Sequence, residues 1–205
     1  VGPWPGLAGR PARGEIWRPR FPATVAVTGE PLAPGVVAPA MHTAYEGATP
    51  TVADSAYVAD QTALMGDVTV GERASVFPFV SLRGDVSEVE IGARTNVQEF
   101  TTVHCGVIGD EVTVGHGAVV DDCLVEDHAL IGMGSCVMSD ATVESNCVVA
   151  ANAVVRQGQT IPEGHLAYGI PAETRELSPE QLELIEWSYE EYVELGRKHA
   201  AARED

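Results

Sequence analysis

An aliphatic residue recurs at every sixth position over most of the chain, with a few irregular steps. The series comprises Val52, Val58, Leu64, Val70, Val76, Leu82, Ile91, Val97, Val103, Ile108, Val114, Val120, Val125, Ile131, Val137, Val143, Val149, Val155 and Ile161. Neither an α-helix nor a simple alternating strand has this period. The fifth position of the repeat is usually small, so the aliphatic position and the fifth position can both point inward. Glycine often follows the aliphatic residue, where it can form the turns.

This period predicts a parallel β-helix, in which each hexapeptide forms one short face of a triangular prism and three hexapeptides form a coil. Successive coils then stack as strands about 4.8 Å apart. Three steps are irregular: residues 82–91 span nine positions, and residues 103–108 and 120–125 span five each. These interruptions cluster around the histidines at 104 and 116.

A C-terminal helix is expected after the repeats end. Ser178 is a suitable N-cap, Pro179 fits the first helical position, and Gln181 completes a capping box. An apolar stripe should pack along the prism or against a neighbouring molecule; it consists of Leu182, Ile185, Tyr189 and Tyr192 or Val193. The expected organisation is therefore a β-helix over residues 41–170 followed by a loop and an α-helix over residues 171–205.

The first forty residues differ from the rest in composition. They contain four Arg, two Glu and eight of the 13 prolines, and they show no hydrophobic period. We interpret residues 1–40 as a non-native or disordered extension, with translation starting at Met41. The stretch "PLAPGVVAPA" is too short and too rich in proline for a signal peptide or a membrane span.

The net charge of −18 excludes function classes that require a cationic surface, namely nucleic-acid binding and binding to anionic membranes. Lys198 is the only lysine, and such an acidic surface is typical of a halophilic cytoplasm. A cytoplasmic protein is expected to keep its thiols reduced, so the four cysteines are expected to be free.

Polar residues fall in columns once the repeats are stacked three to a coil. Arg83, His104 and Asp121 align on one face, and Gln98 lies beside His116 on another. A prism corner separates His116 from His104, so we expect the two to meet only between subunits of a homotrimer. His104 and Asp121 with His116 of a neighbour form a three-point metal site. The alternative is a hydrogen bond between the histidines at the interface, without metal.

Other candidate residues have simpler interpretations. Arg83 and Asp85 form either an ion pair that fixes the subunit contact or part of the catalytic apparatus. Cys147 is expected in the core, whereas Cys105 lies next to His104 and is a candidate neighbour of the metal. The remaining histidines are expected to be solvated; they are His42, His128, His165 and His199.

The segments "SVFPFVSLRGDV", "IGARTNVQEFTTVH", "VTVGHGAVV", "LIGMGSCV" and "IPEGHLAYGIPA" resemble the γ-class carbonic anhydrase family over about residues 50–195. The resemblance implies a left-handed β-helix, a homotrimer, and Zn²⁺ or alternatively Fe²⁺ bound by three histidines between subunits. Two of these match His104 and His116, and the third falls on Asp121. The intersubunit ion pair of the family matches Arg83 and Asp85. Its polar residues beside the metal-bound water match Asn96 and Gln98.

The implied reaction is the reversible hydration of CO₂ to bicarbonate, in which the metal lowers the pKa of bound water. This chain departs from the family at Asp121, at Val86, where some members have a shuttle glutamate, and in the absence of an insertion after His104. Aspartate is shorter than histidine and adds negative charge, so weak activity or a changed metal preference is expected. The alternatives are a non-catalytic trimeric scaffold or metal-binding relative, and an acyltransferase of the same repeat fold. Glu173 disfavours the acyltransferase, because coenzyme A phosphates require basic residues.

Overall fold

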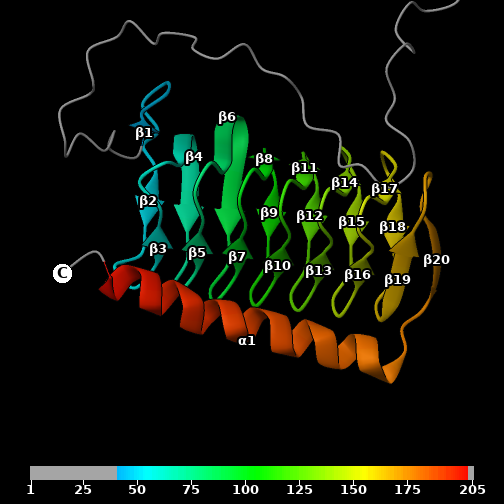
Figure 1. Ribbon diagram of the computed structural model, residues 1–205. Helices are drawn as coiled ribbons and strands as arrows, with labels where there is room; N and C mark the ends of the chain where they lie inside the picture. Colours follow the sequence, from blue (N-terminus) through cyan, green and yellow to red (C-terminus); the bar gives the residue numbers. More distant parts are fainter. Residues whose placement is uncertain (1–40, 203–205) are drawn as a thin grey trace, which may run out of the picture. The chain divides into compact units, whose positions relative to one another are not determined.

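The structure is a computed structural model that describes residues 41–202 (Figure 1). The interpretation of residues 1–40 as an extension lies outside the described residues. Within the described part of the chain, no helix is both long and apolar enough to cross a membrane.

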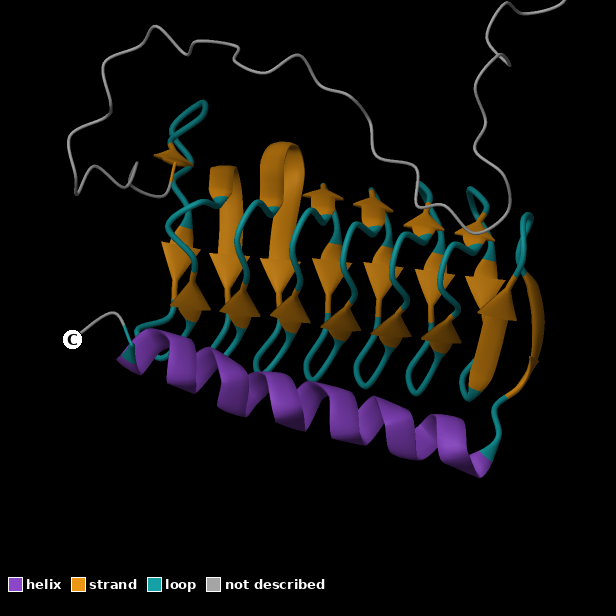
Figure 2. Cartoon of the chain, in the orientation of Figure 1, coloured by secondary structure: helices purple, strands orange, loops and turns teal. Residues whose placement is uncertain are grey.

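The described residues form short strands followed by one long helix, α1 (Pro179–Ala201) (Figure 2). The first strands are β1 (Met41–Thr43), β2 (Thr51–Val52), β3 (Tyr57–Val58), β4 (Ala63–Val70), β5 (Ser75–Val76), β6 (Ser81–Ile91), β7 (Asn96–Val97), β8 (Thr102–His104), β9 (Val107–Ile108) and β10 (Thr113–Val114). The later strands are β11 (Val119–Asp121), β12 (Leu124–Val125), β13 (Leu130–Ile131), β14 (Cys136–Val137), β15 (Thr142–Val143), β16 (Val148–Val149), β17 (Val154–Val155), β18 (Thr160–Ile161), β19 (His165–Tyr168) and β20 (Glu173–Glu176).

These strands build the predicted parallel β-helix. An 8-stranded sheet in the order β20-β19-β16-β13-β10-β7-β5-β3 forms one face. A 12-stranded sheet forms the other two, which are joined where β4 and β6 continue around a corner. The periodic aliphatic residues from Leu64 to Ile161 are at most 1% exposed, and the small fifth-position residues Ala74, Thr95, Ala118, Ala129, Ser135, Ala141 and Ala153 are equally buried. The six-residue period therefore reports the inward-facing positions, as predicted.

The nine-residue step lies within β6. Here β6 pairs with β4 through an irregularity between Gly66 and Val68, which absorbs the extra residues. The two strands approach closely at this point, because a Cβ added to Gly84 would lie 2.0 Å from the carbonyl oxygen of Asp67. Glycine at position 84 is thus required by space, and it lies between two of the predicted site residues.

Helix α1 runs along the 8-stranded sheet, from the side of β19 back towards β3 (Figure 1). The Ser178 N–H donates to Gln181 Oε1 at 3.1 Å, in agreement with the predicted cap. Ile185 and Tyr189 are buried against the sheet, whereas Leu182 is 44% exposed, so the predicted stripe packs only in part within one chain. A Cβ added to Gly196 would lie 2.9 Å from the Cβ of Ser75, which shows how close the helix lies.

Candidate metal centre

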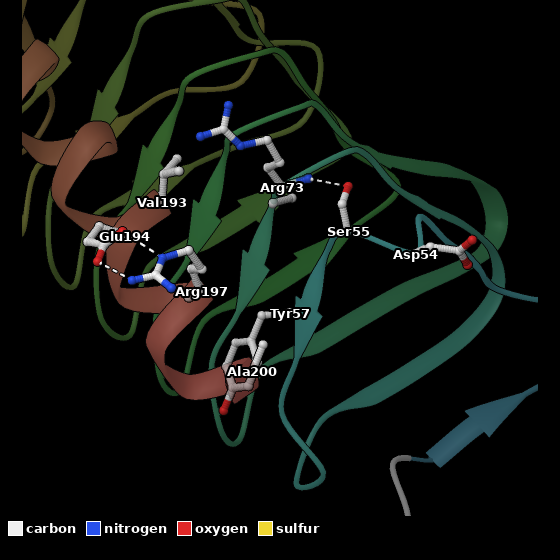
Figure 3. A pocket seen from close by; sticks show the side chains of 10 residues that line it. Asp54, Ser55, Tyr57, Arg73, Val193, Glu194, Arg197 and Ala200 are labelled. Carbon is white, nitrogen blue, oxygen red and sulfur yellow. Dashed lines mark hydrogen bonds and ion pairs between the residues drawn. The ribbon is translucent and has the colours of Figure 1, made fainter. Parts of the chain in front are cut away.

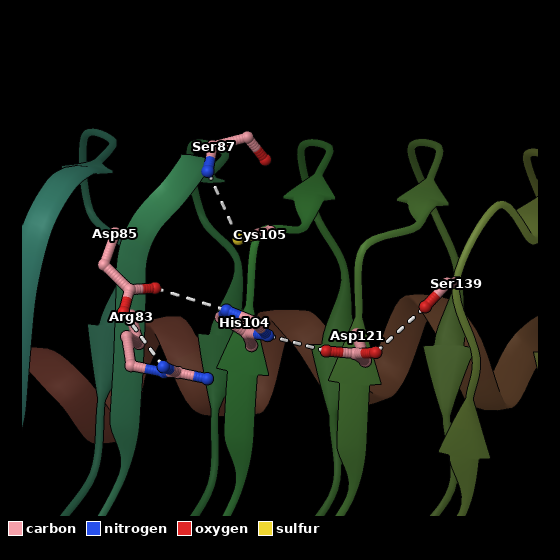
Figure 4. Close-up of polar contacts among 7 residues, drawn as sticks. All are labelled: Arg83, Asp85, Ser87, His104, Cys105, Asp121 and Ser139. Atoms are coloured by element: carbon pink, nitrogen blue, oxygen red, sulfur yellow. Dashed lines mark hydrogen bonds and ion pairs between the residues drawn. The ribbon is translucent and has the colours of Figure 1, made fainter.

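The predicted column of polar residues is confirmed by the strand register. Arg83 of β6 pairs with His104 at the end of β8, and His104 pairs with Asp121 at the end of β11. Each residue directly follows a buried aliphatic position, and this places all three side chains outside one corner of the prism (Figure 4). The stacking of three hexapeptides per coil therefore brings together residues that are 17 to 21 positions apart in the sequence.

Hydrogen bonds connect this column into a chain of side chains (Figure 4). Arg83 donates to Asp85 Oδ2 at 2.9 Å, and Asp85 Oδ1 lies 3.2 Å from His104 Nε2. On the other side of the ring, His104 Nδ1 lies 2.8 Å from Asp121 Oδ1, and Ser139 Oγ donates to Asp121 Oδ2 at 3.0 Å. The hydrogen bond from His104 and, less strongly, that from Ser139 hold the pKa of Asp121 below its ordinary value, against the opposing effect of burial.

Sequence reasoning did not identify Ser139. It lies one coil beyond Asp121 in the column, at the second position after the aliphatic Val137. A serine in a turn carries no distinguishing signal, and only its place in the stack would have indicated its contact with the carboxylate.

Cys105 adds a thiol to the same corner. The ligand atoms of Asp85, His104 and Cys105 all lie within 4.8 Å of one another, and this is the group of metal-binding side chains found in residues 41–202. The sulfur of Cys105 accepts a hydrogen bond from the Ser87 N–H at 3.3 Å. The cluster offers nitrogen, oxygen and sulfur donors, which suit a divalent cation such as Zn²⁺.

The other cysteines are free and more typical of core thiols. Burial raises the pKa of the Cys123 thiol to about 12 and also raises those of Cys136 and Cys147. Cys147 is fully buried, in agreement with the prediction that it belongs to the core.

The remaining predicted residues gather on the 8-stranded sheet and its edge. Asn96 is fully buried; it donates to Thr113 Oγ1 at 2.8 Å and accepts a hydrogen bond from Gln98 Nε2 at 3.0 Å. Gln98 and His116 line the same apolar groove, which has a volume of about 470 Å³. His116 Nδ1 lies 2.8 Å from Glu99 Oε2, a contact that the sequence did not predict.

The described residues of one chain thus hold two separate groups. Arg83, Asp85, His104 and Asp121 share one corner, whereas His116 is not part of the cluster of metal-binding side chains around His104. The expectation that one chain keeps the two histidines apart agrees with this arrangement.

Two other histidines have partners that the sequence did not predict. His128 contacts Glu111 through Nε2, and its ring stacks on Tyr189 at a centroid distance of 5.6 Å. His199 stacks on Tyr57 at 5.5 Å. His199 is nevertheless exposed, in agreement with the prediction that it is solvated, whereas His128 is half-buried because Tyr189 of α1 stacks on its ring.

A separate hollow lies near the first coils of the β-helix (Figure 3). It has a volume of about 380 Å³ and is lined in part by Tyr57, Arg73 and Arg197. Glu194 binds the Arg197 guanidinium through contacts of 2.7 and 2.9 Å, which neutralises one of its two cations. None of the predicted site residues lines this hollow.

Comparison with known proteins first identifies the class of fold to which the chain belongs. The family "Bacterial transferase hexapeptide (six repeats)" matches residues 122–157. The structure of a hexapeptide transferase family protein from Anaplasma phagocytophilum superimposes with a TM-score of 0.76 at 35% identity, over 77% of this chain and 97% of that one. The chain is thus a hexapeptide-repeat β-helix protein.

Two relatives identify the family within this class. The chain is 39% identical over 166 residues to a carbonic anhydrase of Geobacillus kaustophilus, covering 78% of this chain and 91% of the relative. It is 37% identical over 165 residues to the mitochondrial γ carbonic anhydrase 2 of Arabidopsis thaliana, covering 75% of this chain. That alignment spans 59% of the length of the Arabidopsis protein. The chain belongs to the γ-carbonic anhydrase family.

Proposed function

We propose that this protein is a metal-dependent carbonic anhydrase that reversibly hydrates CO₂ to bicarbonate at a site between the subunits of a cytoplasmic homotrimer. The observation that carries the proposal is the register of Arg83, His104 and Asp121 on successive coils, with Asp85 paired to both Arg83 and His104. Family membership supports the same reaction, because relatives at 37–39% identity are named carbonic anhydrases.

The donor atoms at this corner fit a divalent metal. His104, Asp85 and Cys105 provide an imidazole, a carboxylate and a thiol within 4.8 Å of one another. Zn²⁺ accepts all three types, and Fe²⁺ is the alternative. When bound, such a cation supplies Lewis acidity that makes hydroxide available near neutral pH.

The side chains of the chain itself orient this chemistry. Arg83 holds the carboxylate of Asp85, which lies beside His104 Nε2. Asn96 fixes the amide of Gln98 by accepting from its Nε2, so the carbonyl oxygen of Gln98 remains as an acceptor for the O–H of water.

His116 of a neighbouring subunit completes the proposed site. Nδ1 of His116 lies 2.8 Å from Glu99 Oε2, so Nε2 is the nitrogen that we expect to coordinate the metal. Asp121 occupies the third histidine position of the family, either as a ligand or as the hydrogen-bond partner of His104.

Two measurements test this proposal. The metal content of anaerobically purified protein is determined first, and CO₂ hydration is then assayed with and without added Zn²⁺ and Fe²⁺. We expect activity in the wild type and in His42→Ala, an exposed control, and loss of activity in His104→Ala and in His116→Ala. Absence of bound metal under every loading condition would refute the proposed metal-dependent activity.

Mixing the two inactive variants tests the shared site. Within trimers assembled at random from equal amounts of His104→Ala and His116→Ala chains, about a quarter of the interfaces combine an intact His104 with an intact His116. Refolding the mixture should therefore restore about a quarter of the wild-type activity. A mixture that remains inactive would show that each site lies within one subunit.

A further inference from the structure

Each histidine of the proposed centre has a carboxylate oxygen near its Nδ1, but only His104 is hydrogen-bonded to that carboxylate. His104 Nδ1 lies 2.8 Å from a carboxylate oxygen of Asp121, and His116 Nδ1 lies 2.8 Å from one of Glu99. Carboxylate oxygens face both nitrogens of the His104 ring, Asp121 Oδ1 at 2.8 Å from Nδ1 and Asp85 Oδ1 at 3.2 Å from Nε2. We place the proton on Nδ1, where the contact is shorter, so that a metal would bind Nε2 in place of the Asp85 contact. A carboxylate that fixes the tautomer of a metal-bound histidine is a frequent arrangement in metalloproteins. Asp121 therefore holds His104 in the manner of such an orienting carboxylate.

Both oxygens of Asp121 already accept hydrogen bonds. Oδ1 accepts from His104 at 2.8 Å and Oδ2 from Ser139 Oγ at 3.0 Å. Oδ1 binds the ring at Nδ1, and Asp121 is not part of the group of metal-binding side chains that the described residues form around His104. The third protein ligand must then come from another side chain beside His104.

Cys105 is the side chain in that position. Its residue is 7% exposed, and its sulfur belongs with Asp85 and His104 to the group whose ligand atoms lie within 4.8 Å of one another. Asp85 is already paired with Arg83 at 2.9 Å, whereas the Cys105 sulfur accepts only the backbone N–H of Ser87 among the bonds found at this corner. A backbone N–H donated to sulfur orients the side chain as a metal ligand.

We propose that Cys105 supplies the third protein ligand, a thiolate, and that Asp121 is a positioning residue that holds His104. The ligands would then be His104 and Cys105 of one subunit and His116 of the next, with Asp85 beside them. This assignment rests on the metal centre of the proposed function. It adds a softer donor than imidazole, so the site prefers Zn²⁺ to harder cations such as Mg²⁺.

Cobalt substitution tests the sulfur ligand directly. Zinc-free protein is titrated with Co²⁺, and the sulfur-to-cobalt charge-transfer absorption is recorded, which nitrogen and oxygen ligands do not produce. We expect this band in the wild type and its loss in Cys105→Ser and Cys105→Ala. The matched control is Cys123→Ser, because Cys123 is a similarly buried cysteine on the next coil and should not affect the band. Circular dichroism and melting of each metal-free variant establish that it folds.

A further variant tests the role of Asp121. Asp121→Asn should keep the charge-transfer band and weaken Co²⁺ binding by about 10- to 100-fold, as expected for a residue that orients a ligand. Wild-type protein that binds Co²⁺ without the band, or that binds no Co²⁺, would overturn the assignment, as would a band that persists in both Cys105 variants. A band in protein that does not hydrate CO₂ supports the sulfur ligand and refutes the proposed activity. Hydration of CO₂ by protein that lacks the charge-transfer band would support the proposed activity and overturn the sulfur ligand.

Discussion

Gly84 offers a strong test of how the fold positions the site, because it lies in β6 between Arg83 and Asp85. A Cβ at this position would lie 2.0 Å from the carbonyl oxygen of Asp67, whereas ordinary contacts begin at 3.4 Å, so β4 and β6 would have to separate by about 1.4 Å. Strands held at about 4.8 Å by hydrogen bonds cannot absorb this displacement without losing some of those bonds. We therefore expect Gly84→Ala to cost about 3 kcal/mol of unfolding free energy, the upper end for an overpacked site.

The expected result has two parts. For a protein of this size, 3 kcal/mol corresponds to a decrease in Tm of about 6–12 °C, which differential scanning calorimetry at fixed protein concentration measures. Because Asp85 follows Gly84 directly, a displacement of about 1 Å should also reduce CO₂ hydration by about 100-fold.

Gly158→Ala is the matched control for this variant. Gly158 has a φ of +67° and nothing within 4 Å of an added Cβ, so alanine there meets only conformational strain. That strain should cost about 1–2 kcal/mol and leave the activity unchanged. An equal or smaller effect at Gly84 would refute the close approach of β4 and β6.

Three further predictions concern other parts of the chain. The hydrogen bond from His104 lowers the folded-state pKa of Asp121 below its ordinary value, so this contact stabilises the protein above the ordinary pKa, and the contribution disappears as the pH falls through the folded-state value. The side chain of Asp121 is 42% exposed, so the difference in unfolding free energy between wild type and Asp121→Asn at pH 7 should be about 1 kcal/mol or less in denaturant titrations, and it should vanish in acid. Cys123, with a thiol pKa of about 12, should resist iodoacetamide at pH 8.5 until the protein unfolds, as read by mass spectrometry. Gly196→Leu should displace α1 from Ser75, where even a Cβ would lie at 2.9 Å, and should lower the Tm without changing the strand content seen by circular dichroism.

The coils could be predicted from sequence because a parallel β-helix repeats one local rule. Each aliphatic position such as Val114 or Ile131 meets its counterpart one coil away, so the period alone gives the strand register. The helix was predictable for a different reason, since Ser178 and Gln181 are specific local signals. Its contacts were not, because the stacking of Tyr189 on His128 joins residues with no shared repeat.

The column of the candidate site follows from the same periodicity, but its hydrogen bonds do not. The register places Asp121 next to His104, yet only the side-chain geometry shows that the carboxylate binds Nδ1 rather than facing away from the ring. The irregular step within β6 likewise hid the contact between Asp85 and His104, because an alignment by repeats gives no position for residues inside a bulge.

Charge explains why an aspartate can replace an imidazole at this corner. Asp85, Asp121 and a thiolate at Cys105 carry three negative charges, and Glu99 beside His116 adds a fourth, whereas Arg83 and a divalent cation supply three positive charges. The centre that we propose therefore keeps one net negative charge when metal is bound, whereas three neutral histidines in place of Asp121 and Cys105 would leave it with one net positive charge. A compensated cation attracts the electrons of water less strongly, and water there should give up its proton at higher pH. The aspartate at position 121 is therefore expected to shift the pH dependence of CO₂ hydration towards alkaline pH. Asp121→Asn should shift it part of the way back.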